Sequence, residues 1–196
     1  MKSLKKPVTL VASLLALMWA LELVDFVALG HLNRYGIVPR SIDGLWGILW
    51  SPWLHGDFNH LIANTGPFLV LGTLVALRGM RDFLIATLAI MFLGGLGVWL
   101  TGGSHSVHIG ASGLIFGYFG FLLTVGMTER SFKGILVTVL VAGVYGGLLW
   151  GVLPNQPGIS WQGHLFGFLS GLWIGRKVGR ARLPSHSVSA AEKLRT

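Results

Sequence analysis

The sequence predicts an all-α polytopic membrane protein with six transmembrane helices arranged in a bundle. Hydrophobic residues make up 53% of its 196 residues and charged residues only 11%, a balance that excludes an ordinary soluble domain. A helix needs about 20 mostly apolar residues to cross the hydrocarbon, and six such segments fit the chain. The distribution of Lys and Arg over the connections is a second, independent indication of this six-helix arrangement.

The first expected span follows the basic residues Lys2, Lys5 and Lys6. It is too long for the apolar part of a signal peptide, and no small-residue cleavage pattern follows it. Glu22 and Asp25 lie in its outer part, where we expect a structural contact to the following loop. The six expected spans cover about residues 8–29, 57–77, 83–100, 111–127, 134–151 and 160–178.

The connections divide the chain into a short N-terminus of residues 1–7, a membrane domain of residues 8–178 and a polar tail of residues 179–196, expected to be disordered. The longest connection, residues 31–56, carries three of the tryptophans that favour the headgroup zone. Pro154 and Pro157 break the chain before the last helix.

The basic residues indicate which ends of the helices share a side. Thirteen of the 15 Lys and Arg residues fall on one side of the six-helix arrangement, and only Arg34 and Arg40 fall on the other. By the positive-inside rule both termini are cytoplasmic, so the second, fourth and sixth helices begin at the outer face. The net charge of +8 therefore follows topology and gives no reason to expect a nucleic-acid partner.

Four polar residues fall at one depth on this topology. His60 and Asn64 lie in the first two turns of the second helix, Ser112 opens the fourth, and His164 opens the sixth. Polar side chains inside a membrane are costly, and a cluster of them is a candidate functional site.

These residues suggest nucleophilic catalysis. A serine hydroxyl becomes reactive when a histidine accepts its proton, and Ser112 with His164 can form that pair. The backbone N–H of Ser112 and side-chain donors of His60 and Asn64 can stabilise an oxyanion. Only Asp57 is acidic at these helix starts, which favours a dyad over a triad. The chain has no cysteine, which excludes thiol catalysis.

Glycines indicate that the fourth and sixth helices approach closely, as the serine and histidine require. Small residues at helical spacing let two backbones meet in lipid. They are Gly113, Gly117 and Gly120 in the fourth helix, and Gly163, Gly167, Gly171 and Gly175 in the sixth.

Three motifs in order resemble the rhomboid intramembrane serine proteases of the compact six-helix bacterial type. The match is specific because the order and spacing agree together. The motifs are His60-x-x-x-Asn64 in the second helix, Gly110-x-Ser112-Gly113 at the fourth, and His164-x-x-Gly167-x-x-x-Gly171 in the sixth.

The resemblance implies Ser112 as nucleophile, His164 as base, and an oxyanion site of His60, Asn64 and the Ser112 N–H. It implies cleavage of single-pass transmembrane substrates near their outer end, after a small residue, by a multi-pass protein of the bacterial cytoplasmic membrane without a cofactor. Phe116 replaces a common tyrosine but can still pack on the histidine, and Gly163 replaces a common alanine. The gate would be the fifth helix, the 152–160 loop or both. Natural substrate and oligomeric state stay open.

Three alternatives remain from the sequence. Ser112 is also a good helix N-cap, and a catalytically inactive relative that binds membrane proteins would share the fold. A metalloprotein is the third, because several histidines lie on the outer side, although no His-Glu-x-x-His motif is present. Those histidines are His55, His60, His105, His108 and His164; we expect His55 to be a structural residue near the site, and His105 and His108 to face solvent or the site entrance.

Overall fold

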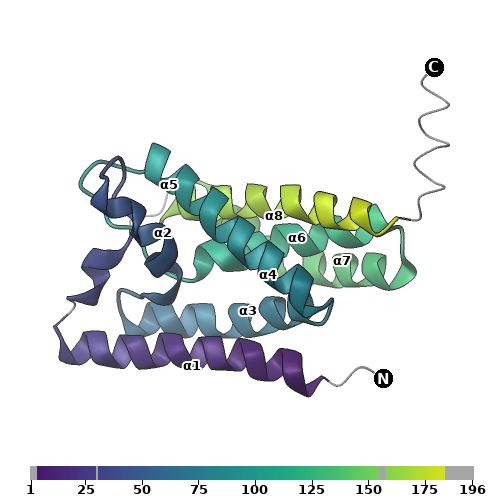
Figure 1. Cartoon of the computed structure of the whole chain (residues 1–196), viewed down its shortest axis with the longest axis horizontal. Helices are drawn as coiled ribbons and strands as arrows, with labels where there is room; N and C mark the ends of the chain where they lie inside the picture. Colours follow the sequence, from purple (N-terminus) through teal and green to yellow (C-terminus); the bar gives the residue numbers. More distant parts are fainter. Residues whose placement is uncertain (1–3, 30, 155–157, 184–196) are drawn as a thin grey trace.

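The computed structural model describes residues 4–29, 31–154 and 158–183, and within them it is an all-α bundle without a strand (Figure 1). The expected tail beyond residue 183, residues 1–3 and Pro157 lie outside this described part. The elements are α1 Lys5–Val27, η1 Leu32–Tyr35, η2 Asp43–Leu45, α2 Gly47–Trp50, η3 Ser51–Trp53, α3 Phe58–Ala76, α4 Met80–Ala89, η4 Ile90–Gly94, α5 Gly95–Thr101, α6 Ser112–Glu129, α7 Phe132–Tyr145, η5 Gly146–Val152 and α8 Trp161–Ala181.

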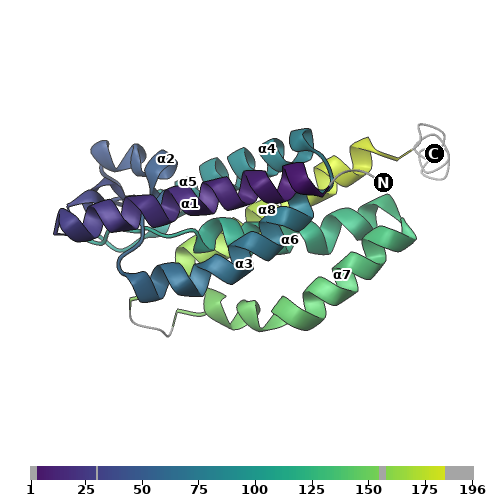
Figure 2. The ribbon, with the colours of Figure 1, turned by 90° about the horizontal axis from the view of Figure 1, so that it is seen from below.

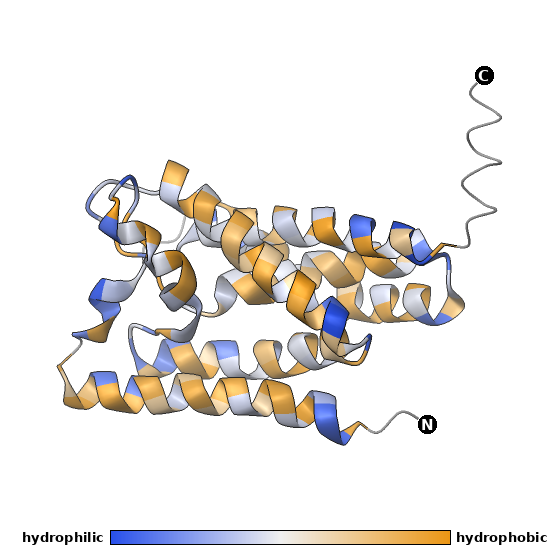
Figure 3. Ribbon diagram, in the orientation of Figure 1, coloured by the Kyte–Doolittle hydropathy of each residue, from blue (hydrophilic) through white to orange (hydrophobic). Residues whose placement is uncertain are grey.

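The all-α membrane class predicted from the sequence is confirmed. Within the described residues, four helical stretches are long and apolar enough to cross a membrane: Lys5–Val27, Met80–Thr101, Ser112–Glu129 and Phe132–Val152. Hydrophilic residues gather mainly at the two ends of the bundle, with apolar residues between them (Figure 3). The more polar α3 and α8 lie beside these spans, and the count of six crossings stays a prediction.

The direction of the helices agrees with the expected order. α1 begins and α8 ends at one end of the bundle, while α3, α6 and α8 begin at the other (Figures 1 and 2). An even number of crossings produces this arrangement. The side of the membrane on which each end lies stays a prediction from the basic residues.

Side-chain caps fix where three of the helices begin. Asp57 Oδ1 accepts from the His60 N–H at 2.8 Å, Ser131 Oγ from Gly134, and Ser160 Oγ from Gly163. Each cap satisfies a backbone donor that has no partner inside the helix. The cap at Ser160 starts α8 one turn before His164.

Two expected helices differ in detail from the structure. The third begins at Met80 and contains the π-helical segment η4, which hydropathy does not reveal because a single π turn inside an almost uniformly apolar segment leaves the hydropathy unchanged. The fifth ends as an α-helix at Tyr145 and continues as the 3-10 segment η5. The expected first connection also folds further, into four short helical turns.

The first connection docks against the loop that leads to α6. Ile37 and His108 exchange backbone hydrogen bonds of 2.9 Å, and Arg40 donates to the carbonyl of Gly102 at 2.8 Å. Asp25 accepts from the Leu32 N–H at 2.6 Å, so the expected structural contact of this carboxylate is confirmed. The connection therefore braces the segment that precedes Ser112.

The bundle is packed unevenly around α6. Of the membrane window of α6, 67% is buried, whereas only 11% of the window in α7 and η5 is buried. Figure 2 shows α3 and α7 on either side of α6, with α7 at the periphery. The central helix is thus the one that begins with Ser112.

Candidate active site

The four polar residues predicted from the sequence line a single cleft. It has a volume of about 930 Å³ and opens between the starts of α3, α6 and α8 and the segment η5. His60, Asn64, Ser112 and His164 all contribute to its wall, together with Phe116. The four residues that hydropathy placed at one membrane depth thus lie on the wall of the same cleft.

The backbone before Ser112 is held from several directions. Gly110 has a φ of +116°, a conformation that side chains rarely adopt, and a Cβ at this position would lie 2.7 Å from the His60 ring. Its N–H donates to the Ser51 carbonyl at 2.8 Å. Glycine at this motif position is therefore required both by conformation and by the close approach of His60.

His55 fixes the next residue of the same segment. The Ala111 N–H donates to His55 Nε2 at 3.3 Å, and the His55 side chain is 1% exposed. Burial lowers the pKa of His55 to about 4, with the neighbouring His60 as a second cause, so the ring is neutral and its Nε2 is free to accept. The expectation of a structural histidine near the site is confirmed.

His164 is oriented by two contacts. Its ring stacks on Phe116 with centroids 4.0 Å apart and an interplanar angle of 8°, and its Nδ1 lies 2.8 Å from the Gly151 carbonyl. A carbonyl only accepts, so Nδ1 carries the proton and Nε2 of the neutral ring keeps its lone pair. This is the tautomer that a general base for serine needs.

No hydrogen bond joins Ser112 Oγ and the His164 ring among the described residues. Catalytic hydrogen bonds are often long without substrate and tighten when it binds. The structure thus brings the two residues to one cleft, and direct contact between them stays a prediction.

His60 and Asn64 lie one turn apart on the face of α3 that lines the cleft. Asn64 Nδ2 donates one hydrogen to the His60 carbonyl at 3.1 Å, which leaves its second N–H available. The His60 ring lies against Gly110, in the loop that leads to Ser112. Both side chains are thus near the first turn of α6, where backbone donors are free.

Glycines bring α6 and α8 into backbone contact. A Cβ at Gly167 would overlap the Gly113 carbonyl, and one at Gly171 would overlap the Gly117 carbonyl. Gly163 lies against Ser160 and near the Gly113 side of α6. The predicted close approach of these helices is therefore present, and it sets the distance between the elements that carry Ser112 and His164.

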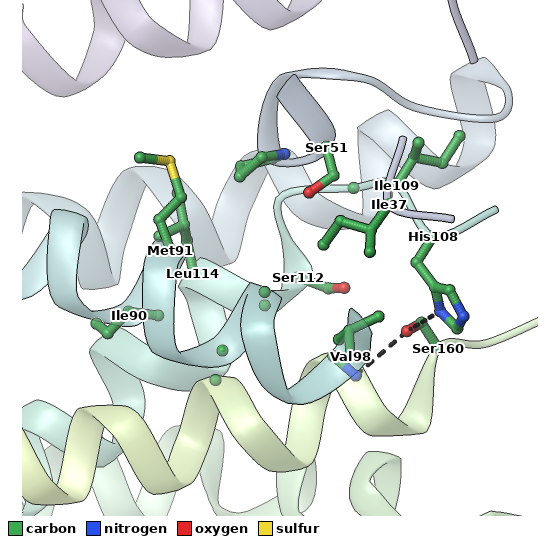
Figure 4. A pocket seen from close by; sticks show the side chains of 17 residues that line it. Ile37, Ser51, Ile90, Met91, Val98, His108, Ile109, Ser112, Leu114 and Ser160 are labelled. Atoms are coloured by element: carbon green, nitrogen blue, oxygen red, sulfur yellow. Dashed lines mark hydrogen bonds between the residues drawn. The ribbon is translucent and has the colours of Figure 1, made fainter. Parts of the chain in front are cut away.

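A second, smaller cavity lies behind Ser112 (Figure 4). Its volume is about 50 Å³, and its lining is mostly apolar. Figure 4 shows the Ser112 side chain among Ile37, Met91 and Val98, with His108 and Ser160 at the edge. One wall comes from the π-helical segment η4, which includes Ile90 and Gly94. The cavity is much smaller than the 930 Å³ cleft.

His108 contributes to the site in a way that the sequence did not indicate. Its Nδ1 lies 2.6 Å from Ser160 Oγ and its Nε2 lies 2.8 Å from Ser106 Oγ. The Ser106 hydroxyl donates to Gly103, so Nε2 must donate to Ser106, and Nδ1 of the neutral ring accepts from Ser160. Burial lowers the pKa of His108, in agreement with a neutral ring.

This bridge adds to the sequence expectation. His105 is exposed and His108 lines the cleft, both as expected, and His108 also joins the loop before Ser112 to the cap of α8. The sequence could not predict this bridge, because a histidine in a polar loop can equally well be exposed to solvent.

The metal alternative gains no support from the structure. Among the described residues, no group of three or more His, Cys, Asp or Glu side chains is arranged to hold a metal ion. The five outer histidines are instead spread over the loops and helix starts around the cleft.

Comparisons with known proteins agree with the motifs. The profile of the Rhomboid domain matches residues 43–181. The uncharacterized protein Rv1337 of Mycobacterium tuberculosis is 45% identical over 172 residues, covering 84% of this chain and 72% of that protein. YdcA of Bacillus subtilis, named as a candidate rhomboid protease, is 31% identical over 139 residues, covering 67% of each.

A plant relative matches over a smaller share of its length. RHOMBOID-like protein 4 of Arabidopsis thaliana is 31% identical over 145 residues, covering 70% of this chain and 35% of that protein. No solved structure matches the chain at a significant level. On the domain match and the identities above, this chain belongs to the rhomboid family.

Proposed function

We propose that this protein is an intramembrane serine endopeptidase, with Ser112 as nucleophile and His164 as general base. Membership of the rhomboid family suggests intramembrane proteolysis in general terms. The assignment of Ser112 and His164 as a catalytic dyad is our own addition. The observation that carries it is the common cleft, into which α3, α6 and α8 bring His60, Asn64, Ser112 and His164.

The chemistry follows from the proton on His164. Because Nδ1–H is donated to Gly151, Nε2 accepts the Ser112 proton as Oγ attacks the scissile carbonyl. The C–N bond then breaks, and the leaving amine takes that proton from Nε2. A water molecule, deprotonated by the same nitrogen, hydrolyses the acyl-enzyme and restores Ser112.

Donors around the first turn of α6 support the tetrahedral intermediates. The Ser112 N–H lies at the positive end of the helix dipole, and His60 and Asn64 line the same cleft. Each such donor typically contributes about a hundredfold or more to the rate. A fixed set of donors is needed because little bulk water reaches a site below the membrane surface.

The substrate in this proposal is a single-pass transmembrane segment that unwinds near its outer end. A scissile carbonyl inside an intact helix is occupied by its own hydrogen bond, so a strand must enter the cleft. The 50 Å³ cavity beside Ser112 supports cleavage after a small side chain such as alanine. The thinly packed α7 and η5 support lateral entry beside them.

The same proposal includes the location. The distribution of basic residues favours cytoplasmic termini, in the cytoplasmic membrane of a bacterium, with the cleft opening to the outer face. A cysteine placed near Gly56 and one placed near Arg130 would be labelled by a membrane-impermeant reagent from opposite sides. Labelling of the Arg130 site from outside would contradict this orientation.

The deciding experiment uses the protein in proteoliposomes with a single-pass reporter that carries alanine or phenylalanine before the candidate cleavage bond. We expect Ser112→Ala to abolish cleavage of the alanine reporter, and the phenylalanine reporter to be cleaved poorly by the wild type. Ser170→Ala, which removes a hydroxyl bonded to the Phe166 carbonyl of its own helix and outside the cleft lining, is the matched control and should retain most activity. Cleavage by Ser112→Ala at the wild-type rate would refute the proposal, and capture of the reporter without cleavage would favour the inactive binder.

A further inference from the structure

A second hollow lies at the end of the bundle opposite the Ser112 cleft, where α3 and α6 end and α7 begins. Its volume is about 400 Å³. We call it the basic hollow; its lining consists of Leu74, Leu77, Arg78, Leu122, Val125, Gly126, Ser131, Lys133, Gly134, Val137 and Arg182.

The lining of the basic hollow divides into an apolar part and a cationic part. Leu74, Leu122 and Val137 come from the apolar interiors of α3, α6 and α7, whereas Lys133 and Arg182 lie at helix ends. None of the acidic side chains that the structure describes contributes to the lining. A ligand that fills it must be apolar along one part and negatively charged at the other.

The charge balance leaves a net positive potential at the mouth. Arg78 pairs with Glu129, and Arg182 pairs with Asp82 at 2.6 Å, so these two cations are largely neutralised. Lys133 has no ion pair within the described part of the chain, and its side chain is exposed. Lys133 is thus the cation free to bind an incoming anion.

We propose that the basic hollow binds an anionic phospholipid, with the phosphate at Lys133 and Ser131 and an acyl chain along the apolar lining. Leu140 and Val144 follow Val137 by three and seven residues and therefore share its face of α7; they are 58% and 74% exposed, so they continue this lining along the helix. A soluble anion would use the mouth alone and leave the apolar part unfilled. Basic pockets between transmembrane helices are suited to such headgroups.

A lipid in the basic hollow would connect α7 to α3, two helices that have few direct contacts. α7 packs against α6, whereas α3 contributes to the hollow from the other side (Figure 2). A lipid between them would tie the beginning of α7 to α3 and α8. This function is independent of the proposed proteolysis.

The test uses the full chain in nanodiscs of phosphatidylcholine with or without phosphatidylglycerol, and measures Tm together with retained lipid by native mass spectrometry. A ligand that binds only the folded state raises Tm, so phosphatidylglycerol should raise the Tm of the wild type. Lys133→Gln should lower the preference for phosphatidylglycerol over phosphatidylcholine by about fivefold, the effect of one cation near an anionic headgroup.

Two variants control for charge and for folding. Lys177→Gln removes a cation that lies over Trp173 on α8, outside the hollow, and should retain the preference. Lys133→Arg keeps the charge and should also retain it. If Lys133→Gln keeps the wild-type preference, or Lys177→Gln loses as much, the proposal is wrong.

A final experiment distinguishes a lipid headgroup from free inorganic phosphate as the ligand of the basic hollow. Inorganic phosphate added to phosphatidylcholine nanodiscs should leave Tm unchanged, because it cannot occupy the apolar lining. A shift equal to that of phosphatidylglycerol, abolished by Lys133→Gln, would identify a site for a soluble anion and overturn the lipid assignment.

Discussion

The pair α6–α8 and the helix α7 illustrate two ways in which glycine is used in this bundle. At Gly167 and Gly171 a Cβ would overlap backbone atoms of α6, whereas at Gly143 and Gly147 no other atom lies within 4 Å. The first set allows close packing, and the second leaves a helix end without side-chain anchors. Ser112 and His164 thus lie on a closely packed pair of helices beside a loosely packed neighbour.

One contact joins the loosely held part to the site. The carbonyl of Gly151, in η5, accepts a hydrogen bond from His164 Nδ1, and Gly151 lies against the Phe116 ring. A movement of α7 and η5 that admits a substrate would therefore also act on the group that orients the base. If the proposed function holds, this backbone carbonyl would couple opening of the cleft to the orientation of His164.

The largest expected effect comes from separating α6 and α8. Gly171→Val places two methyl groups against the Gly117 carbonyl, so the helices must move apart. A displacement of about 1 Å at a catalytic group can cost about a hundredfold in rate, and overpacking costs about 1–3 kcal/mol of stability. We expect reporter cleavage to fall by at least about a hundredfold and Tm to decrease.

The matched control for this change is Gly143→Val in α7, where the added atoms meet open space. Its cleavage rate should stay within about twofold of the wild type, because β-branching costs a helix only a few tenths of a kcal/mol relative to other residues. Equal losses in the two variants would contradict the contrast between α6–α8 and α7.

A smaller effect is expected at the contact between η5 and the base. Gly151→Val would bring a Cβ to 2.8 Å from the Phe116 ring and 3.2 Å from His164 Nδ1, which displaces the carbonyl. We expect kcat to fall by up to about a hundredfold, the lower limit of what general-base catalysis contributes, with Tm nearly unchanged. Gly147→Val, four residues earlier in η5, should leave kcat near the wild-type value, and a similar fall there would indicate a general disturbance of η5.

The smallest effect concerns the bridge between the loop before Ser112 and the start of α8. His108→Phe keeps a ring but removes the bonds to Ser106 and Ser160, each worth about 0.5–1.5 kcal/mol. We expect about a tenfold lower kcat/KM, with the two single variants Ser106→Ala and Ser160→Ala each losing less. A double-mutant cycle of His108→Phe with Ser160→Ala should reveal coupling, and strictly additive losses would exclude the bridge.

The candidate site was predictable from the sequence to the extent that it depends on side chains at helix starts. Hydropathy and basic residues placed His60, Ser112 and His164 at one depth, and glycine spacing predicted the α6–α8 contact. The oriented tautomer of His164 was not predictable, because its partner is a backbone carbonyl and every residue has one. The bridge of His108 was likewise hidden, since it depends on how a loop lies against the cap of another helix.

The fold shows the same division. The apolar segments located the spans to within a few residues, whereas the π-helical η4 and the turns of the first connection came only from packing. The basic hollow also arises where the ends of α3 and α8 meet the turn between α6 and α7, three segments that are distant from one another in the sequence.

The central claim is that His164 activates Ser112 inside the cleft, and covalent labelling tests it most directly. A fluorophosphonate probe reacts only with a serine whose proton can be removed, and intact-protein and peptide mass spectrometry locate the adduct. The account predicts one adduct, on Ser112, that is absent in Ser112→Ala, lost in His164→Ala and retained in Gly143→Val. Labelling of Ser112 at the wild-type rate in His164→Ala, or an adduct at another serine alone, would contradict it.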